Sequence, residues 1–585
     1  MAGILGIHPG SCRNNFKPRG YITKQDPGEL VNLGNMEAPH IQPVFVLLGI
    51  VFVTWRLIKH VWTPESVLHR LPGPPRASYL TGNLPQFLSR HGTEFQRHVA
   101  LDYGLVSKIH GPMGSIIPYI SDPKALHSIL IKEEDIFQET DHFFTENNLL
   151  LGPGLLSTAG DVHRRQRKLL LPAFSSTHLR SMLPLVYQIA YKLRDAISAQ
   201  VKTEQEDIDM LSWMGRTALE VIGQGGLGYS FDPLVKDAGD EYGHALKHLV
   251  PSMQRFSGMR NIVYFFSKIG PAWFRRLLLD MIPYQHLQTL KKIVDTMSEK
   301  SQEIYEAKKA SLSMGTEVLL EQIGEGKDIM SILMRANMAT SSAESLSEYE
   351  LVSQISTLVI GATDTSSNLM ARILERLADN IDVQEKLRQE ILDAKAGLGL
   401  SFDDLFQLPY LDNICRETLR LDPPLVFTFR TATQDTVLPL SEPVVANDGS
   451  LINELPISKG TNVLIGVLGC NANKALWGED AFDWKPERWL SPLPSAVTKN
   501  PIPGVYSNLR KEILHTRFNS GFKFSEMEMK VVLSVLLSHF RFRPSGKPIE
   551  WNVGVVRYPT IGKISGAPQL PLKVEPLESS SRSLA

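Results

Sequence analysis

Apolar residues recur at helical spacing through most of the chain between residues 90 and 490. In the stretch 349–379, for example, Leu351 and Ile355 fall on one face of a helix, and the same period continues to the end of the stretch. Shorter alternating runs, such as Val106–His110, predict strands of small sheets. The pattern therefore predicts a fold that is mainly α with small β-sheets.

A hydrophobic segment at 43–62 predicts an N-terminal membrane anchor. It reaches the roughly 20 residues that a spanning helix requires if Arg56 and Lys59 extend toward the headgroups. The leader 1–42 has no hydrophobic period, so we predict that it is unstructured and that the anchor is not a removed signal peptide. Basic residues flank both sides of the anchor, and those on its C-terminal side favour a cytosolic body.

The anchor is followed by a proline-rich segment, 63–76, which we predict to be a hinge. Leu71–Pro75 cannot be helical, because each proline lacks an amide donor and restricts the residue before it. Residues 77–575 are predicted to form one large domain, and the Ser-rich tail 576–585 to be disordered.

Composition excludes several classes of function. The 61 basic and 62 acidic residues nearly cancel, so no nucleic-acid partner is expected. Only three cysteines occur, an odd number at wide spacing that fits neither a disulfide framework nor a CxxC metal site. Cys415 and Cys470 lie in apolar surroundings and are interpreted as small core residues, in a reducing compartment.

Polar residues interrupt the apolar pattern in the middle of the longest predicted helix. The segment 359–367 contains Gly361, Asp364 and Thr365, although glycine and short polar residues are poor helix formers. A helix whose hydrogen-bond ladder opens from Gly361 to Thr365 would form a groove for a small ligand, with Asp364 and Thr365 as a proton-delivery pair. The alternative is a polar patch on a buried helix.

Three further charge patterns lie along the chain. Glu417 and Arg420 are spaced to pair on one helix face, and Arg488 follows in a Pro-Glu-Arg-Trp sequence. His163 and Arg167 stand four residues apart in a basic run, which by itself would be a solvated surface. Arg430 follows a Pro-Pro turn, and its guanidinium suits planar carboxylates.

Taken in order, these motifs resemble those of the cytochrome P450 family of the fungal microsomal kind, over roughly residues 65–570. The resemblance implies the cytochrome P450 fold, heme b as cofactor, and insertion of one oxygen atom from O2 into a lipophilic small molecule in secondary metabolism. It further implies electrons from NADPH through a membrane-bound cytochrome P450 reductase. The location would be the endoplasmic reticulum membrane, with a single span and a cytosolic catalytic domain.

The same resemblance implies a role for each candidate residue. Thr365 would hydrogen-bond bound dioxygen, and Asp364 would relay protons. The haem propionates would be held by His163, Arg167, Arg430 and Arg517. Glu417, Arg420 and Arg488 would form a structural charge triad.

The iron-binding loop departs from the family. The pattern Phe-x-x-Gly-x-Arg-x-Cys-x-Gly aligns so that Gly521 and Glu528 match the following helix and Arg517 is kept, but Asn519 occupies the cysteine position. His515 and Glu512 replace the glycine and the aromatic residue of the pattern. No other metal site is predicted.

This departure leaves two interpretations open. A neutral amide does not replace a thiolate, which supplies the electron density that favours O–O cleavage. Either a splice or reading-frame error altered residues 510–520, or the cysteine is lost and the protein is a catalytically inactive body of the same fold. His515 is expected to be a bystander.

The substrate is not specified by the sequence. In this family the pocket is lined by variable segments, here 135–155, 205–265 and 425–430. Aromatic and aliphatic residues in them, such as Phe143, Leu149 and Phe427, predict an apolar pocket.

Overall fold

The computed structural model describes residues 66–203, 207–232, 234–235, 241–256, 260–314, 326–499 and 521–577. The predicted leader, the anchor 43–62 and the first residues of the hinge lie outside these ranges. So do Arg517, Asn519 and nearly all of the tail. Within the described ranges, no helix has the length and apolar character needed to cross a membrane.

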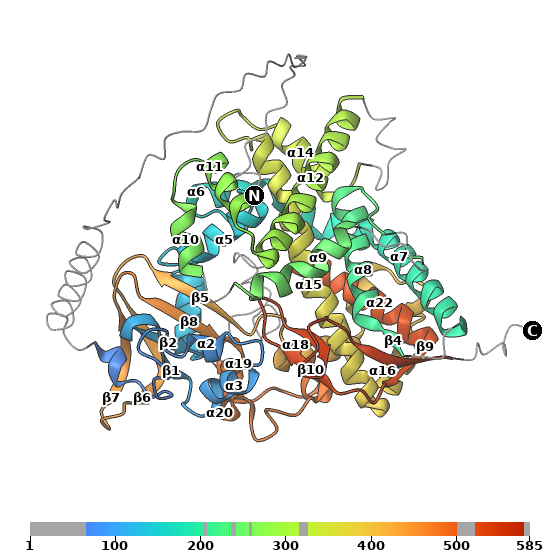
Figure 1. Cartoon of the computed structure of the whole chain (residues 1–585). Helices are drawn as coiled ribbons and strands as arrows, with labels where there is room; N and C mark the ends of the chain where they lie inside the picture. Colours follow the sequence, from blue (N-terminus) through green and yellow to red (C-terminus); the bar gives the residue numbers. More distant parts are fainter. Residues whose placement is uncertain are drawn as a thin grey trace, which may run out of the picture.

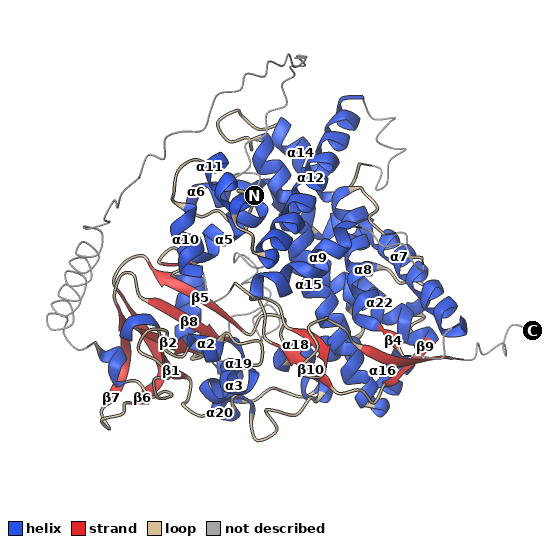
Figure 2. Ribbon diagram, in the orientation of Figure 1, coloured by secondary structure: helices blue, strands red, loops and turns tan. Residues whose placement is uncertain are grey.

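The described chain is mainly helical with small sheets, as predicted (Figures 1 and 2). Helices fill most of the body, and the strands gather on one side and along one edge. The helices are α2 (Leu84–Phe87), α3 (Thr93–Leu101), α4 (Pro123–His127), α5 (Asp141–Leu151), α6 (Gly160–Leu170), α7 (Ser176–Thr203), α8 (Met210–Val221), α9 (Glu241–Gln254), α10 (Arg260–Ser267), α11 (Ala272–Met281), α12 (Gln285–Met314), α14 (Ile329–Met338), α15 (Glu348–Asp379), α16 (Ile381–Asp393), α17 (Phe402–Phe406), α18 (Pro409–Leu421), α19 (Val467–Asn471), α20 (Lys474–Trp477), α21 (Ser495–Lys499) and α22 (Phe522–His539).

The largest sheet of the described chain joins segments that are far apart in sequence. Its strand order is β1-β2-β8-β5-β3, with β2 and β8 parallel and the other neighbours antiparallel. Three smaller sheets pair β6 with β7, β10 with β11, and β12 with both β4 and β9. The strands are β1 (Val106–His110), β2 (Ile116–Ile120), β3 (Phe137–Gln138), β4 (Ile208–Asp209), β5 (Phe427–Ala432), β6 (Thr436–Val445), β7 (Leu451–Ile457), β8 (Asn462–Gly466), β9 (Phe540–Pro544), β10 (Ile549–Asn552), β11 (Tyr558–Ile561) and β12 (Pro571–Pro576).

The long helix α15 passes through the helical body and positions most of the site. It begins with a capping box, in which Ser347 and Glu350 each accept a hydrogen bond from the other's backbone N–H. Its apolar residues pack against α8, α12 and α22 in the larger hydrophobic core. Most residues of α22 are buried, among them the charged side chains of Glu526, Glu528 and Lys530, so the helix is enclosed on most of its faces.

The described part of the predicted hinge is packed against the first sheet. Leu71 is fully buried, and the backbone N–H of Lys108 on β1 donates to the carbonyl of Pro72 at 2.8 Å. A Cβ at Gly73 would lie 2.2 Å from the carbonyl oxygen of Lys108, so only glycine permits this approach. The segment therefore has a fixed direction where it enters the body.

Candidate functional site

The polar segment of α15 borders open space. Gly361 is exposed, and a Cβ built there would have no described atom within 4 Å. Thr365 lies one turn further along the same face, and its hydroxyl donates to the carbonyl of Gly361 at 2.7 Å. This face of the helix can therefore contact a ligand.

The predicted opening of the helix at this point is wrong. From Glu348 to Asp379 α15 is one continuous helix without an irregular residue. The Thr365 hydroxyl bonds the carbonyl four residues earlier, which a regular helix accommodates. Space at Gly361 thus comes from the missing side chain and not from a break in the backbone ladder.

Asp364 is an ionisable residue of α15 that precedes Thr365 directly. Burial raises the pKa of its carboxyl group to about 7. Its backbone carbonyl accepts hydrogen bonds from the side chains of Ser367 and Asn368, at 3.3 and 2.9 Å. A carboxyl group that is partly protonated near neutral pH can both give and take a proton.

His163 and Arg167 lie four residues apart on α6, which is docked onto the start of α15. His163 is buried, and Arg167 is half-buried. The neighbouring Arg165 and Gln166 donate to the carboxylate of Glu350 at 2.7 and 3.2 Å. Glu350 therefore fixes α6, and the two predicted propionate contacts with it, relative to α15.

Arg430 lies on β5 and meets an acidic partner that the sequence did not indicate. Its Nη1 is 2.5 Å from Oε1 of Glu139 and also donates to the hydroxyl of Thr428 at 3.0 Å. Both charged side chains are nearly inaccessible to solvent. Glu139 lies in a short loop after β3 with no motif around it, so only the folded arrangement reveals this pair.

The structure brings Glu417, Arg420 and Arg488 together. Arg420 donates to both carboxylate oxygens of Glu417, at 2.9 and 2.7 Å, and Nε of Arg488 lies 3.3 Å from Oε1. Glu417 is fully buried and also accepts from the indole of Trp489 at 3.0 Å. The cluster joins α18 to the turn that contains Arg488 and is far in sequence from the open face at Gly361.

The first turns of α22 contact α15 beside its polar segment. The hydroxyl of Ser366 on α15 donates to that of Ser525 at 3.2 Å. Glu528, one turn further along α22, is fully buried, and apart from the nearby hydroxyl of Ser366 its carboxyl oxygens have no hydrogen-bond partner among the described residues. Burial raises the pKa of Glu528 to about 8, so it is mostly neutral at pH 7.

A comparison with protein families matches residues 72–501 to the cytochrome P450 model. Cytochrome P450 monooxygenase 81 of Postia placenta is 54% identical over 92% of this chain and 98% of its own length. Cytochrome P450 monooxygenase 91 of the same fungus is 46% identical over 92% of this chain and 99% of its own length. Ganoderic acid synthetase of Ganoderma lucidum is 44% identical over 91% of this chain and 98% of its own length.

The chain belongs to the cytochrome P450 family. The relatives named above as monooxygenases are enzymes, and this cytochrome P450 is an enzyme of their class. The family match ends at residue 501, so the region 505–521, which lacks the family's cysteine, lies beyond it.

The residues around this site fit one part of a haem group and not another. The open face at Gly361 and the hydroxyl of Thr365 would border the group, and the buried side chains of His163 and Arg430 have the chemistry to hold its acidic groups. The donor set for the iron does not fit, because Asn519 stands at the expected thiolate position.

The two described cysteines cannot supply the missing ligand. Cys415 and Cys470 are free thiols, both completely buried, on α18 and α19. Burial raises the pKa of the Cys415 thiol to about 12 and also raises that of Cys470, so both remain protonated. They are core residues, as predicted from their apolar surroundings.

Proposed function

We propose that this cytochrome P450 is a haem-dependent monooxygenase that inserts one oxygen atom from O2 into a lipophilic small molecule. Bound haem with a thiolate ligand would supply the oxygen activation. The observation that carries the proposal is the pair Asp364 and Thr365 beside the open face of α15. A carboxyl group with a pKa of about 7 beside a hydroxyl is suited to hold and release a proton at this face near neutral pH.

The residues of this chain would divide the remaining tasks. His163, Arg167 and Arg430 would orient the cofactor through its propionates. For Arg430 this requires the ion pair with Glu139 to rearrange or to be shared. Electrons would come from NADPH through a cytochrome P450 reductase, as in microsomal members of the family.

The substrate is proposed to be a secondary metabolite, such as a terpenoid. One relative is named for the synthesis of ganoderic acid, which supports this class. The predicted pocket segments meet at α5 and α10, where Tyr264 donates to Asp141 at 3.3 Å and its ring lies 4.9 Å from that of His142. The half-buried Phe143 and Leu149 on α5 favour an apolar ligand there.

A second candidate function rests on Asn519. If the sequence is translated as it stands, the protein lacks the axial thiolate and would be a catalytically inactive body with the cytochrome P450 fold. A splice or reading-frame error within 510–520 would remove this objection. Sequencing the transcript across codons 505–521 decides between the two. A Cys codon in the transcript would show that the given sequence contains a splice or reading-frame error, and its absence would show that the cysteine is lost.

The carbon monoxide difference spectrum of the reduced protein tests the function directly. It should be recorded for the protein as written and for a repaired form with Asn519→Cys, His515→Gly and Glu512→Phe. A thiolate-type Soret band in the repaired form alone supports an intact oxygenase body. Absence of haem from both forms would refute the haem-dependent proposal.

We also propose that the catalytic domain lies against the endoplasmic reticulum membrane, to which the predicted single span would attach it. Helix α11 exposes Trp273, Leu277 and Met281, which lie four residues apart on one face. The preceding helix α10 exposes Phe265 and Phe266 nearby in sequence. Such a large apolar patch marks an interaction surface, and a lipid bilayer fits its chemistry.

A polarity-sensitive dye tests this orientation. Attached to the full chain at Leu277→Cys, it should shift to shorter wavelength on reconstitution into phospholipid vesicles. The same dye at the exposed Lys573→Cys on β12 should not shift. Equal spectra at both positions would refute the proposed contact.

A further inference from the structure

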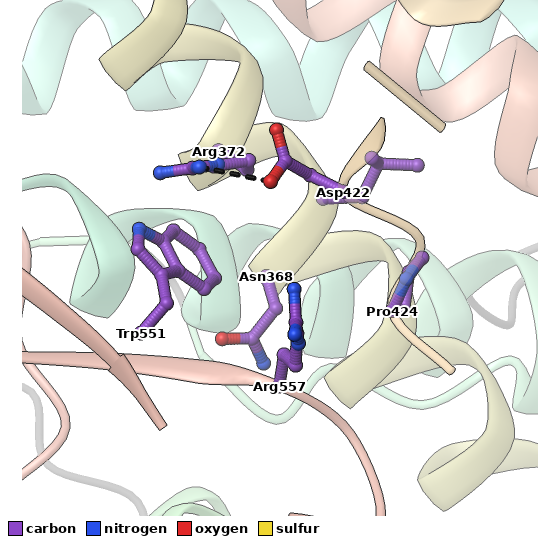
Figure 3. A pocket seen from close by; sticks show the side chains of 7 residues that line it. Asn368, Arg372, Asp422, Pro424, Trp551 and Arg557 are labelled. Carbon is purple, nitrogen blue, oxygen red and sulfur yellow. Dashed lines mark hydrogen bonds and ion pairs between the residues drawn. The ribbon is translucent and has the colours of Figure 1, made fainter. Parts of the chain in front are cut away.

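A small cavity lies beside α15, beyond the residues assigned to oxygen and cofactor (Figure 3). Asn368 and Arg372 of α15 form one wall, and the hairpin of β10 and β11 supplies Trp551 and Arg557. The turn after α18 closes it with Asp422 and Pro424. The cavity has room for about one water molecule.

Arg557 presents an unused donor edge in this cavity wall. The residue is only 8% exposed, and its Nε and Nη2 atoms have no hydrogen-bond partner among the described residues. These two N–H groups point the same way and form the edge by which a guanidinium holds an anion. The backbone N–H of Arg557 donates to the carbonyl of Pro424 at 3.0 Å, so the hairpin cannot easily withdraw it.

The surrounding ion pairs leave the charge of Arg557 only partly compensated, by Asp422. Asp422 accepts from Arg372 at 2.8 Å and from Arg376 at 2.7 Å. Glu375 forms a second contact with Arg372, at 2.5 Å. Two carboxylates therefore serve two arginines, and Arg557 adds a third positive charge to a largely buried cluster.

Two observations bear on what fills the space. The side-chain oxygen of Asn368 also lacks a partner among the described residues, and water could satisfy it together with Arg557. Water would leave a positive charge, which Asp422 offsets in part and which nearby Arg372 and Arg97 reinforce. Burial lowers the pKa of Arg557 to about 10, so it remains a cation at neutral pH. Charge balance therefore favours an anion over water.

We propose that this cavity is a binding site for a small monovalent anion, held by Nε and Nη2 of Arg557. A single-atom halide is closer to the size of this space than a carboxylate, which is larger than the cavity. The bound anion neutralises the cluster and holds the 553–557 hairpin turn against Pro424 and α15. Because Asn368 binds the backbone of Asp364 at 2.9 Å, the site adjoins the proton-delivery segment without including it.

Thermal unfolding of the full-length protein in detergent tests the site without any need for haem or activity. Chloride or bromide, exchanged for gluconate at constant ionic strength, should raise the unfolding midpoint by about 1–3 °C, because a ligand that binds only the folded state stabilises it. Acetate, which is too large, should not. The rise should vanish in Arg557→Gln and persist in Arg543→Gln, a surface arginine paired with Glu575.

The outcomes separate the possibilities. A halide effect of equal size in Arg557→Gln, or an equal effect of acetate in the parent protein, would overturn the proposal. If Arg557→Gln does not fold, crystals of the parent protein soaked in bromide give an independent answer. An anomalous peak at hydrogen-bond distance from Nε and Nη2 supports the site, and an ordered water without bromide overturns it.

Discussion

Arg165 on α6 donates a hydrogen bond to Glu350 of α15 at 2.7 Å, at the position where α15 begins. The same carboxylate accepts from the backbone N–H of Ser347 at 2.9 Å and so completes the capping box. One acidic side chain therefore both starts the long helix and docks the helix that carries His163. The placement of His163 relative to α15 therefore depends on a helix cap.

Replacing Glu350 by Gln should lower the free energy of unfolding by about 1–3 kcal/mol, because a charge-assisted contact to Arg165 is lost. Burial works against the ionised form, but hydrogen bonds from Ser347, Gln166 and Arg165 together hold the pKa of Glu350 below its usual value. This stability is therefore present above about pH 4.5 and is lost as the pH falls through the lowered pKa. Denaturant unfolding at pH 7 and pH 4 measures both effects.

The matched control is Lys168→Gln, which removes an exposed ion pair to Glu344 from the same helix. It should change the free energy of unfolding by less than about 0.5 kcal/mol. Equal losses in the two variants would contradict the role assigned to Glu350.

Glu528 should make the protein less stable as the pH rises. Its pKa is raised by burial to about 8, above the value of an unfolded glutamate, so the folded state holds a proton that the unfolded state has released. The contribution of this group to the free energy of unfolding is then greatest below about pH 4.5. It decreases as the pH rises from 4.5 to 8 and is constant above about pH 8. Glu528→Gln should remove this loss, with a gain of up to about 5 kcal/mol at pH 9.

Unfolding in denaturant at pH 6 and pH 9 measures the effect of Glu528→Gln. The exposed Glu575 on β12 provides the control, since Glu575→Gln should show the same pH dependence as the parent protein. A stability difference between parent and Glu528→Gln that does not grow with pH would mean that the carboxyl group finds a partner in solution.

Much of the fold and part of the site could be predicted from the sequence for local reasons. The apolar period predicts α15, and spacing on one helix face predicts the contact of Glu417 with Arg420. The pairing of Arg430 with Glu139 could not be predicted, because it joins a strand to a distant loop. The continuity of α15 at Gly361 was missed since weak helix propensity was outweighed by packing along the whole helix.

Removal of the Glu417 carboxylate should disrupt the structure and not merely the chemistry. Glu417→Gln leaves Arg420 buried without its counter-ion and leaves Arg488 with Asp480 as its acidic partner, which costs about 3–5 kcal/mol. The variant should show a lower unfolding midpoint and faster proteolysis between α18 and Arg488. Lys386→Gln, which breaks the exposed pair with Glu487 close by, should behave like the parent protein. A stable Glu417→Gln variant would refute the structural role of the triad.

The proton-delivery pair can be examined only in the form with the repaired iron loop. There, Asp364→Asn should slow turnover by about 10²-fold or more, because the amide cannot give up a proton. Since the pKa of Asp364 is raised to about 7, its acidic form is lost as the pH rises through 7, and turnover of the repaired parent should fall over the same range. Asp364→Asn should flatten that fall.

Thr365→Val provides the companion variant, because it removes the hydroxyl and keeps the shape and the helix. In this variant, more of the NADPH consumed should reduce O2 to peroxide or water without forming product. The pH dependence of turnover should be kept, since Asp364 remains. The measurement is product formed per NADPH consumed between pH 6 and pH 8.5. A pH profile that is unchanged in Asp364→Asn would show that protons enter by another route, and the open face at Gly361 would then be a binding surface alone.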